Sequence, residues 1–286
     1  MRKMTRIAAG LAVFLMAAVA GCTEIPEYLT VSGTRITGCD KDRVPANLVI
    51  PKGITEIDSF VFRDCTSLET VTIPASVKTI GYGAFNGCEN IKTVKYMGTL
   101  AQWCQIDNTS YYENATITLS DVPDLRALKT LVIPDGVTSI GSSAFYRCKE
   151  LTSVTIPASV RTIGHESFGN CTSLESVTIP AGVTKIDGFA FMGCTSLKSV
   201  TIPETVTEIS TQAFYECSLE SVTIPSSVKT MGGGAFSCMN LKTVKYNGTK
   251  AQWRKISING TTADPWAFWD GVTVHCTDGN IPANQN

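Results

Sequence analysis

Histidine is nearly absent from this 286-residue sequence, which contains only His165 and His275. Histidine is the commonest side chain in acid–base catalysis and metal binding. Neither histidine belongs to a catalytic motif, because G-x-S-x-G is absent and His165-Glu166 does not continue into H-E-x-x-H. The carboxylates are scattered without partners, and no glycine pattern fits a phosphate-binding loop. We therefore expect no enzyme, no catalytic residue and no cofactor-binding residue.

Charged residues are also scarce, at 17% of the chain. Three of the basic ones, Arg2, Lys3 and Arg6, lie in a segment that we expect to be removed. Without these three, 21 basic residues stand against 25 acidic ones, a net charge of −4. Nucleic acids and anionic lipids both attract concentrated positive charge. The composition therefore argues against nucleic acid as a partner and against electrostatic binding to lipid.

Paired metal-ligand spacing is missing as well. The 11 cysteines include no C-x-x-C pair, the spacing typical of zinc sites, so no metal site is expected. Long apolar runs are limited to the one from Ile7 to Ala20, which is too short to be a comfortable spanning helix.

The first 21 residues have the pattern of a secretory signal peptide, a basic start followed by that apolar run. The segment ends in Val19-Ala20-Gly21-Cys22, which resembles the lipobox of bacterial lipoproteins. The resemblance implies cleavage before Cys22 and acylation of its sulfur, and Thr23 gives no inner-membrane retention signal. We expect a lipid anchor in the cell envelope, at the outer membrane or cell surface. An ordinary signal peptide followed by a chance cysteine is the alternative.

A 23-residue repeat organises most of the remaining chain, and one complete unit runs from Leu151 to Cys171. The spacing is 23 residues within each run, apart from one step of 22 caused by a deletion near Ser218. Its clearest mark is the dipeptide Ile-Pro, at Ile50-Pro51, Ile73-Pro74, Ile133-Pro134, Ile156-Pro157, Ile179-Pro180, Ile202-Pro203 and Ile224-Pro225. A fixed period of this length indicates a solenoid.

Each unit begins with a predicted strand. Leu151, Val154 and Ile156 follow an L-x-x-L-x-L spacing, and the alternation of the last two marks one buried face. Pro157 cannot donate a ladder hydrogen bond, so we expect the strand to end there.

The second half of the unit is expected to turn back toward the core. Ile163 points inward again, Gly164 permits a tight bend and Phe168 fills the middle of the coil. One coil cannot bury its apolar side alone, so neighbouring coils must stack. The pattern predicts a β-rich α/β repeat solenoid with a parallel sheet on one face and short helical turns or loops on the other.

Two further residue types recur with the repeat. The phenylalanines, which we expect in the core, are Phe62, Phe85, Phe145, Phe168, Phe191, Phe214 and Phe236. The cysteines are Cys65, Cys88, Cys148, Cys171, Cys194, Cys217 and Cys238. We interpret them as buried structural thiols, since free cysteine behaves as a small apolar residue. Disulfides between adjacent coils are the alternative.

The unit resembles the BspA-type leucine-rich repeat, found in surface proteins of Bacteroides, Treponema and related bacteria. The resemblance covers roughly residues 45–245. It implies a right-handed, curved leucine-rich-repeat superhelix. It also implies adhesion at the cell surface or binding to host or neighbouring-cell proteins, since several family members bind extracellular matrix components.

The solenoid is interrupted once, and the interruption is itself repeated: residues 92–103 recur at 242–253. Trp103 and Trp253 occupy equivalent positions and are expected to pack in the core. We therefore divide the chain into five segments. These are the signal peptide (1–21), a lipid tether with a cap hairpin (22–43), two repeat blocks with Trp-bearing inserts (44–121 and 125–278) and a tail (279–286).

Two groups of residues are candidate ligand contacts. The residue between Val and Ile of each strand should point outward, at Thr72, Thr155, Thr178, Thr201 and Thr223. A preference of Thr for strands is the alternative explanation. The second group is the aromatic cluster Trp266, Phe268 and Trp269, which either seals the last coil or contacts a protein or sugar.

The function expected from these features is a non-catalytic cell-surface adhesin or binding scaffold. Its partner would be a protein on a host cell or a neighbouring cell, recognised through the repeat array. The alternatives are a glycan-capturing lipoprotein that uses Trp266, Phe268 and Trp269, and a purely structural envelope protein.

Overall fold

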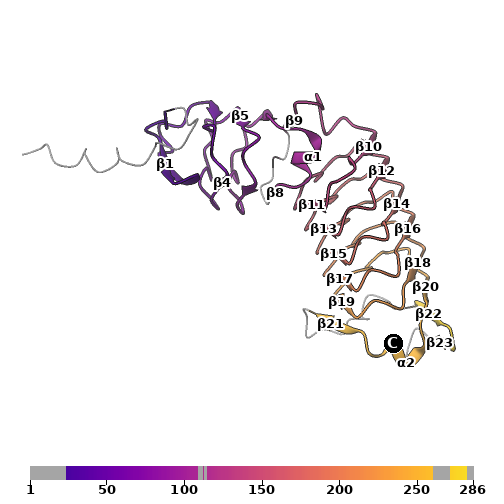
Figure 1. Ribbon diagram of the computed structural model, residues 1–286. Helices are drawn as coiled ribbons and strands as arrows, with labels where there is room; N and C mark the ends of the chain where they lie inside the picture. Colours follow the sequence, from indigo (N-terminus) through magenta and orange to yellow (C-terminus); the bar gives the residue numbers. More distant parts are fainter. Residues whose placement is uncertain (1–23, 109–111, 113–114, 260–270, 282–286) are drawn as a thin grey trace, which may run out of the picture.

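The computed structural model describes residues 24–108, 112, 115–259 and 271–281, and these form a solenoid of stacked coils (Figure 1). Strands of successive coils pair in parallel, offset by one repeat: Ser176 of one coil lies beside Ser199 of the next. The predicted repeat solenoid with 23-residue units and parallel sheets is confirmed. Cys22, Trp266, Phe268 and Trp269 lie outside the described residues.

The predicted strand of each unit forms a series of sheets along the outer side of the bend in Figure 1, which we term the outer sheets. In the first block they are β3 (Asn47–Val49), β5 (Thr70–Ile73), β7 (Thr93–Tyr96) and β9 (Thr116–Thr118). In the second block they are β10 (Thr130–Val132), β12 (Ser153–Thr155), β14 (Ser176–Thr178) and β16 (Ser199–Thr201), followed by a separate sheet of β18 (Ser221–Ile224), β20 (Thr243–Tyr246), β22 (Thr273–Cys276) and β23 (Gly279–Ile281). The hydrogen-bonded ladder breaks between β16 and β18, where the repeat is one residue shorter.

A second series, the inner sheets, lies on the opposite side, where turns or loops were expected (Figure 1). In the first block it contains β1 (Leu29–Ser32), β2 (Arg35–Cys39), β4 (Glu56–Ile57), β6 (Thr79–Ile80) and β8 (Asp107–Asn108). In the second block it contains β11 (Ser139–Ile140), β13 (Thr162–Ile163), β15 (Lys185–Ile186), β17 (Glu208–Ile209), β19 (Thr230–Gly232) and β21 (Ser257–Asn259). The inward-turning Ile163 and its equivalents are thus strand residues. Most of these strands have two residues, too few to show a period in the sequence.

Helix is confined to one short turn in each insert, among the described residues. The helices are α1 (Leu100–Trp103) and α2 (Lys250–Trp253). Each begins with a capping box, in which a Thr side chain accepts from a Gln backbone N–H three residues later and the Gln side chain reaches back to the Thr backbone N–H. An Asp from the following segment adds a second cap: Asp121 accepts from Leu100 N–H at 2.9 Å, and Asp278 from Lys250 N–H at 2.8 Å.

The phenylalanines form the centre of the core, as predicted. All seven are at most 1% exposed. In the second block, Phe145, Phe168, Phe191, Phe214 and Phe236 stack with ring centroids 5.0–5.3 Å apart and interplanar angles of 3–13°. This spacing is close to the 4.7–4.9 Å separation of paired strands. One side chain per coil can therefore contact its equivalents on both sides.

Around each phenylalanine the backbone makes a third inter-coil ladder. Glu166, Phe168 and Asn170 each donate an N–H to the next coil, to the carbonyls of Gly188, Ala190 and Met192 at 2.6–3.1 Å. In this coil the backbone of two residues is in the left-handed conformation, with φ 51° at Glu166 and φ 58° at Asn170. This conformation allows the N–H groups of alternate residues to point toward the same neighbouring coil. A left-handed conformation costs a non-glycine residue about 1–2 kcal/mol. Hydrogen bonding between coils offsets this strain.

Gly164 has a different role from the predicted tight bend. It is not among the residues with positive φ. A Cβ atom added there would lie 2.6 Å from the carbonyl oxygen of Ile140 and 2.9 Å from the carbonyl carbon of Gly141 in the preceding coil. The position therefore requires glycine because two backbones approach closely.

The phenylalanine stack yields a stability prediction. Phe191→Ala should lower the free energy of unfolding by about 3–5 kcal/mol, because it removes a fully buried ring from between Phe168 and Phe214. Phe60→Ala is the matched control. Its ring is 43% exposed, and the loss should be below about 1 kcal/mol. Urea denaturation followed by circular dichroism measures both, and equal losses would contradict a core role for the stack.

Candidate functional site

The outer sheets carry a surface of hydroxyl groups in the second block. On β12, β14, β16 and β18, every outward-facing strand residue is an exposed Ser or Thr. We call this set the hydroxyl face: Ser153, Thr155, Ser176, Thr178, Ser199, Thr201, Ser221 and Thr223. Val177 on β14 and the Ile residues that follow the strands are buried, so alternation holds each hydroxyl toward solvent.

Register aligns these side chains in two rows. Ser176 pairs with Ser199 and Thr178 with Thr201 across β14 and β16, and Ser153 pairs with Ser176 across β12 and β14. The five predicted threonines therefore occupy equivalent outward positions, but they are not all equal. Thr72 lies on β5 of the first block and is half-buried, whereas the other four are exposed.

The row of threonines ends in residues that sequence reasoning missed. Its first member in each block is valine: Val49 pairs with Thr72 and Val132 with Thr155, and these valines are 57% and 66% exposed. Extending the repeat register by one unit upstream would have identified both. At the other end, Lys245 pairs with Thr223, and His275 pairs with Lys245.

The hydroxyl face carries no charge of its own. The nearest charged residues lie just before the strands, and some of them pair with the opposite sign: Lys242 Nζ lies 4.0 Å from Glu220 Oε2. A hydroxyl group both donates and accepts a hydrogen bond. Recognition at this face would depend on hydrogen bonding and shape rather than on electrostatic steering.

The insert tryptophans are buried, which confirms their predicted packing role. Trp103 is 1% exposed and lies 5.4 Å from the ring of Tyr96, and Trp253 is 2% exposed and lies 5.1 Å from Tyr246. The indole Nε1 of Trp103 also donates to the carbonyl oxygen of Ala144 at 2.8 Å. Trp103 thereby links the first insert to the first coil of the second block.

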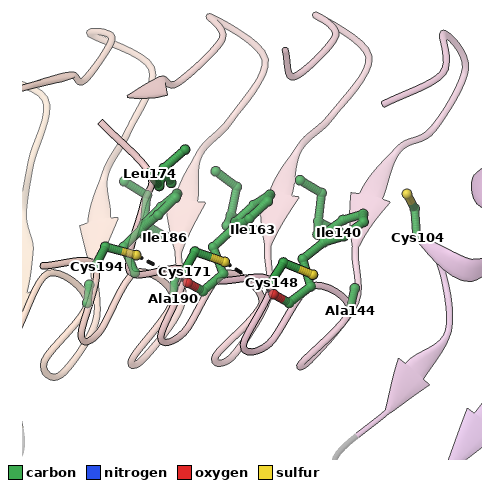
Figure 2. Packing of buried hydrophobic residues seen from close by; sticks show 14 of the residues in the cluster. Cys104, Ile140, Ala144, Cys148, Ile163, Cys171, Leu174, Ile186, Ala190 and Cys194 are labelled. Atoms are coloured by element: carbon green, nitrogen blue, oxygen red, sulfur yellow. Dashed lines mark hydrogen bonds between the residues drawn. The ribbon is translucent and has the colours of Figure 1, made fainter. Parts of the chain in front are cut away.

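The ladder cysteines are buried and unpaired, as interpreted from the sequence, and none of the ten described cysteines is in a disulfide. Figure 2 shows Cys148, Cys171 and Cys194 in line on successive coils. The thiol of Cys171 donates to the carbonyl of Phe145, and that of Cys194 to the carbonyl of Phe168, both at 3.2 Å. These two thiols therefore form hydrogen bonds to the coil before their own, which is a structural role.

The two histidines do not meet. His165 is half-buried and packs edge-on against Phe189 at 5.2 Å, whereas His275 Nδ1 lies 2.9 Å from Asn280 Oδ1 in the last sheet. Within the part of the chain that the structure describes, no three His, Cys, Asp or Glu side chains gather as a metal site would need. In the same part, no helix has the length and apolar character needed to cross a membrane.

Comparison with known proteins identifies the type of repeat in this chain. It matches the family described as BspA type leucine-rich repeat region, in six copies over residues 45–124 and 123–242. A leucine-rich repeat protein from Bacteroides ovatus shares 20% identity with a TM-score of 0.48, over 88% of this chain and 68% of that one. The leucine-rich repeat protein of T. pallidum shares 23% identity with a TM-score of 0.33, over 78% and 86%.

A third solved structure is described as a leucine rich cell surface protein from Faecalibacterium prausnitzii. It shares 20% identity with a TM-score of 0.33, over 84% of this chain and 98% of that one. No curated protein matches the chain.

Burial of the thiols predicts a loss of stability in alkali. Burial raises the pKa of Cys194 to about 12, from 9.0 when unperturbed. The folded state therefore holds this proton more tightly, and the stabilisation is complete below about pH 9 and lost as the pH rises toward 12. For this thiol the loss between pH 8 and 10.5 should be about 2 kcal/mol.

Urea denaturation at both pH values tests this, with Cys194→Ala as the comparison. The variant should be less stable at pH 8 but should lose less stability on going to pH 10.5. An equal loss in both proteins would show that Cys194 does not titrate differently in the folded state.

Proposed function

Because this chain belongs to the BspA-type leucine-rich repeat family, we propose that it is a non-catalytic cell-surface scaffold that binds another protein through its hydroxyl face. The observation that carries this proposal is the uniform exposure of Ser and Thr on four neighbouring strands. A flat array of this kind suits a protein surface, whereas a small ligand would need a concave pocket.

The same array has a structural explanation, since β-branched Thr is common in strands. That preference accounts for Thr178 but less well for Ser176 and Ser199, because Ser is not among the residues enriched in strands. Small hydroxyl residues at both outward positions leave the backbone of the sheet accessible from outside. This favours contact with a partner over strand propensity alone.

The proposed location is the cell envelope, with the lipid anchor at Cys22. The hairpin of β1 and β2, the first elements after the leader, lies at one end of the solenoid, and β22 and β23 lie at the other (Figure 1). An anchor before the hairpin would place the membrane at the first end. The repeats would then be displayed away from it.

Substitutions on the hydroxyl face test the proposed binding. Thr178→Glu with Thr201→Glu should weaken binding to the target by more than about tenfold, because two carboxylates would be buried unpaired at the contact. Thr184→Glu with Thr207→Glu is the control: both residues are exposed and precede inner strands β15 and β17. Each pair should change the free energy of unfolding by less than about 1 kcal/mol.

The assay is an array of extracellular matrix proteins and glycans probed with the parent protein and both variants. Equal weakening by both pairs, or no saturable binding to any protein on the array, would contradict the proposal. Binding to glycans alone, lost on substituting Trp266 and Trp269, would favour the glycan-capturing alternative.

The anchor has a separate test. Cys22→Ser should abolish fatty-acid incorporation and release the protein from the envelope fraction, because acyl chains on this sulfur provide the membrane affinity. Labelling cells with a radioactive fatty acid and fractionating them measures both effects. A variant that stayed cell-associated and was processed as before would show that Cys22 is not the anchor.

A further inference from the structure

The charge of the chain changes sign near its C-terminal end. Residues 22–225 contain 15 basic and 22 acidic residues, whereas residues 226–286 contain 6 basic and 3 acidic ones. The six cations of the second segment are Lys229, Lys242, Lys245, Lys250, Arg254 and Lys255. A protein that is acidic as a whole therefore ends in a basic region, which we call the basic end.

The structure places these cations on the last coils. Lys245 lies on β20, Lys250 begins α2, and Lys229 directly precedes β19. Arg254 and Lys255 follow α2 and are exposed. All six thus belong to the last two coils and the second insert, at the end of the solenoid farthest from the hairpin (Figure 1).

Among the described residues, most of these cations have no carboxylate within ion-pair distance. Across the described residues, Lys242 alone among the six has a carboxylate within 4 Å, that of Glu220. Some lysines of the preceding coils do have such a partner: Lys185 lies 3.5 Å from Asp187 and 3.2 Å from Glu208, and Lys92 lies 3.0 Å from Glu69. The basic end thus has an excess of cations over carboxylates, with six basic and three acidic residues, and such an excess attracts anions.

Two of the cations line a pocket. It has a volume of about 160 Å³ and is lined by Ser226, Val228, Lys229, Tyr246, Gln252, Lys255 and Ile256. Lys229 and Lys255 are exposed, whereas Val228 and Ile256 are buried. The Ser226 hydroxyl lies 3.2 Å from Glu204 Oε2, so one carboxylate lies beside the pocket. Gln252 Oε1 accepts from the Thr249 backbone N–H, which leaves the Gln252 amide N–H groups as donors, and Tyr246 contributes an aromatic ring. The pocket is smaller than a typical drug-sized site of about 300–1,000 Å³, so it suits one substituent or one ring of a longer ligand.

The internal duplication provides a comparison for this pocket. The first insert shares the main structural features of the second: a capping box at Thr99 and Gln102, and Tyr96 packed beside Trp103. At the positions equivalent to Ser226 and Lys255, however, it has Ala75 and Gln105. The second lysine and the hydroxyl are thus particular to the C-terminal copy.

At two further insert positions the second copy has a basic residue where the first has an apolar one. Leu100 and Cys104 of the first copy are buried, and Cys104 accepts a backbone hydrogen bond from Gly141 of the second block. Their equivalents in the second copy are Lys250 and Arg254. Residues on an end coil face solvent and must be polar rather than apolar. Solvent exposure alone does not determine whether these polar residues are basic, acidic or neutral. The choice of cations at each replaced position indicates an anionic partner.

We infer that the basic end binds an acidic polysaccharide, with a sulfate or carboxylate group held by Lys229 and Lys255. The Ser226 oxygen would accept from a sugar hydroxyl, the Gln252 amide N–H groups would donate to sugar oxygens, and the Tyr246 ring would contact a sugar face. Five of the six cations are Lys rather than Arg, which disfavours nucleic acid, because base stacking and bidentate phosphate contacts use Arg. This site is distinct from the hydroxyl face and does not rest on the proposed function.

Heparin binding to the purified protein tests the inference, measured by calorimetry at several salt concentrations. Lys229→Gln with Lys255→Gln should weaken binding about tenfold and make its salt dependence shallower, since two surface ion contacts are lost. The matched control removes the same charge from the first block, Lys78→Gln with Lys95→Gln, where Lys78 and Lys95 are equivalent to Lys229 and Lys245. It should change binding less than twofold.

The outcomes are distinct. Absence of heparin binding, or equal weakening by the control pair, would overturn the site. Binding of poly-glutamate as tightly as heparin would overturn the choice of polysaccharide in favour of an acidic protein segment. Dextran, which is neutral, should not bind. The variant Thr178→Glu with Thr201→Glu should keep full heparin affinity, so that failure of the hydroxyl face and failure of the basic end can be told apart. Urea denaturation checks that every variant is folded.

Discussion

Stacking of equivalent side chains between neighbouring coils is the interaction on which this structure depends. A single coil of 23 residues has an apolar interior that it cannot bury alone. The Phe rings contact each other at 5.0–5.3 Å, which matches the separation of paired strands. The ring spacing and the strand spacing agree, so the hydrogen bonds between coils can repeat along the solenoid. Examples are the bond from the Cys194 thiol to the Phe168 carbonyl and the bond from the Phe168 N–H to the Ala190 carbonyl.

The same constraint makes the ends of each repeat block special, because a terminal coil has only one neighbour. The first block ends in an insert whose Trp103 packs on Tyr96 and donates to Ala144, so the second block covers it. The second insert has the same frame but ends the solenoid. Where the first copy buries Leu100 and Cys104, the second therefore has Lys250 and Arg254. The duplicated insert thus connects the two repeat blocks in its first copy and lies at the end of the solenoid in its second.

Stacking also separates structural positions from positions open to function. Val177 and Phe191 are fixed by the core, whereas Thr178 between two buried residues can change without disturbing it. The exposed positions of the solenoid form two chemically different surfaces, the neutral hydroxyl face and the basic end. The low net charge of the whole chain hides the second surface, because the acidic residues lie mostly in the preceding coils.

The sequence by itself determined the 23-residue period, the burial of the Phe and Cys residues and the outward direction of Thr155 and Thr178, since these follow from identity repeated at a fixed spacing. The lipid anchor at Cys22 and a contact role for Trp266, Phe268 and Trp269 stay predictions. Only the tertiary structure decided that the second half of each coil is also a sheet, because strands such as Thr162–Ile163 exist through their bonds to the next coil and are too short to leave a pattern. It also decided that Gly164 serves close backbone approach, and that Lys229 and Lys255, 26 positions apart in the sequence, line one pocket. Such placements depend on how one coil lies against another, and local sequence carries no record of that.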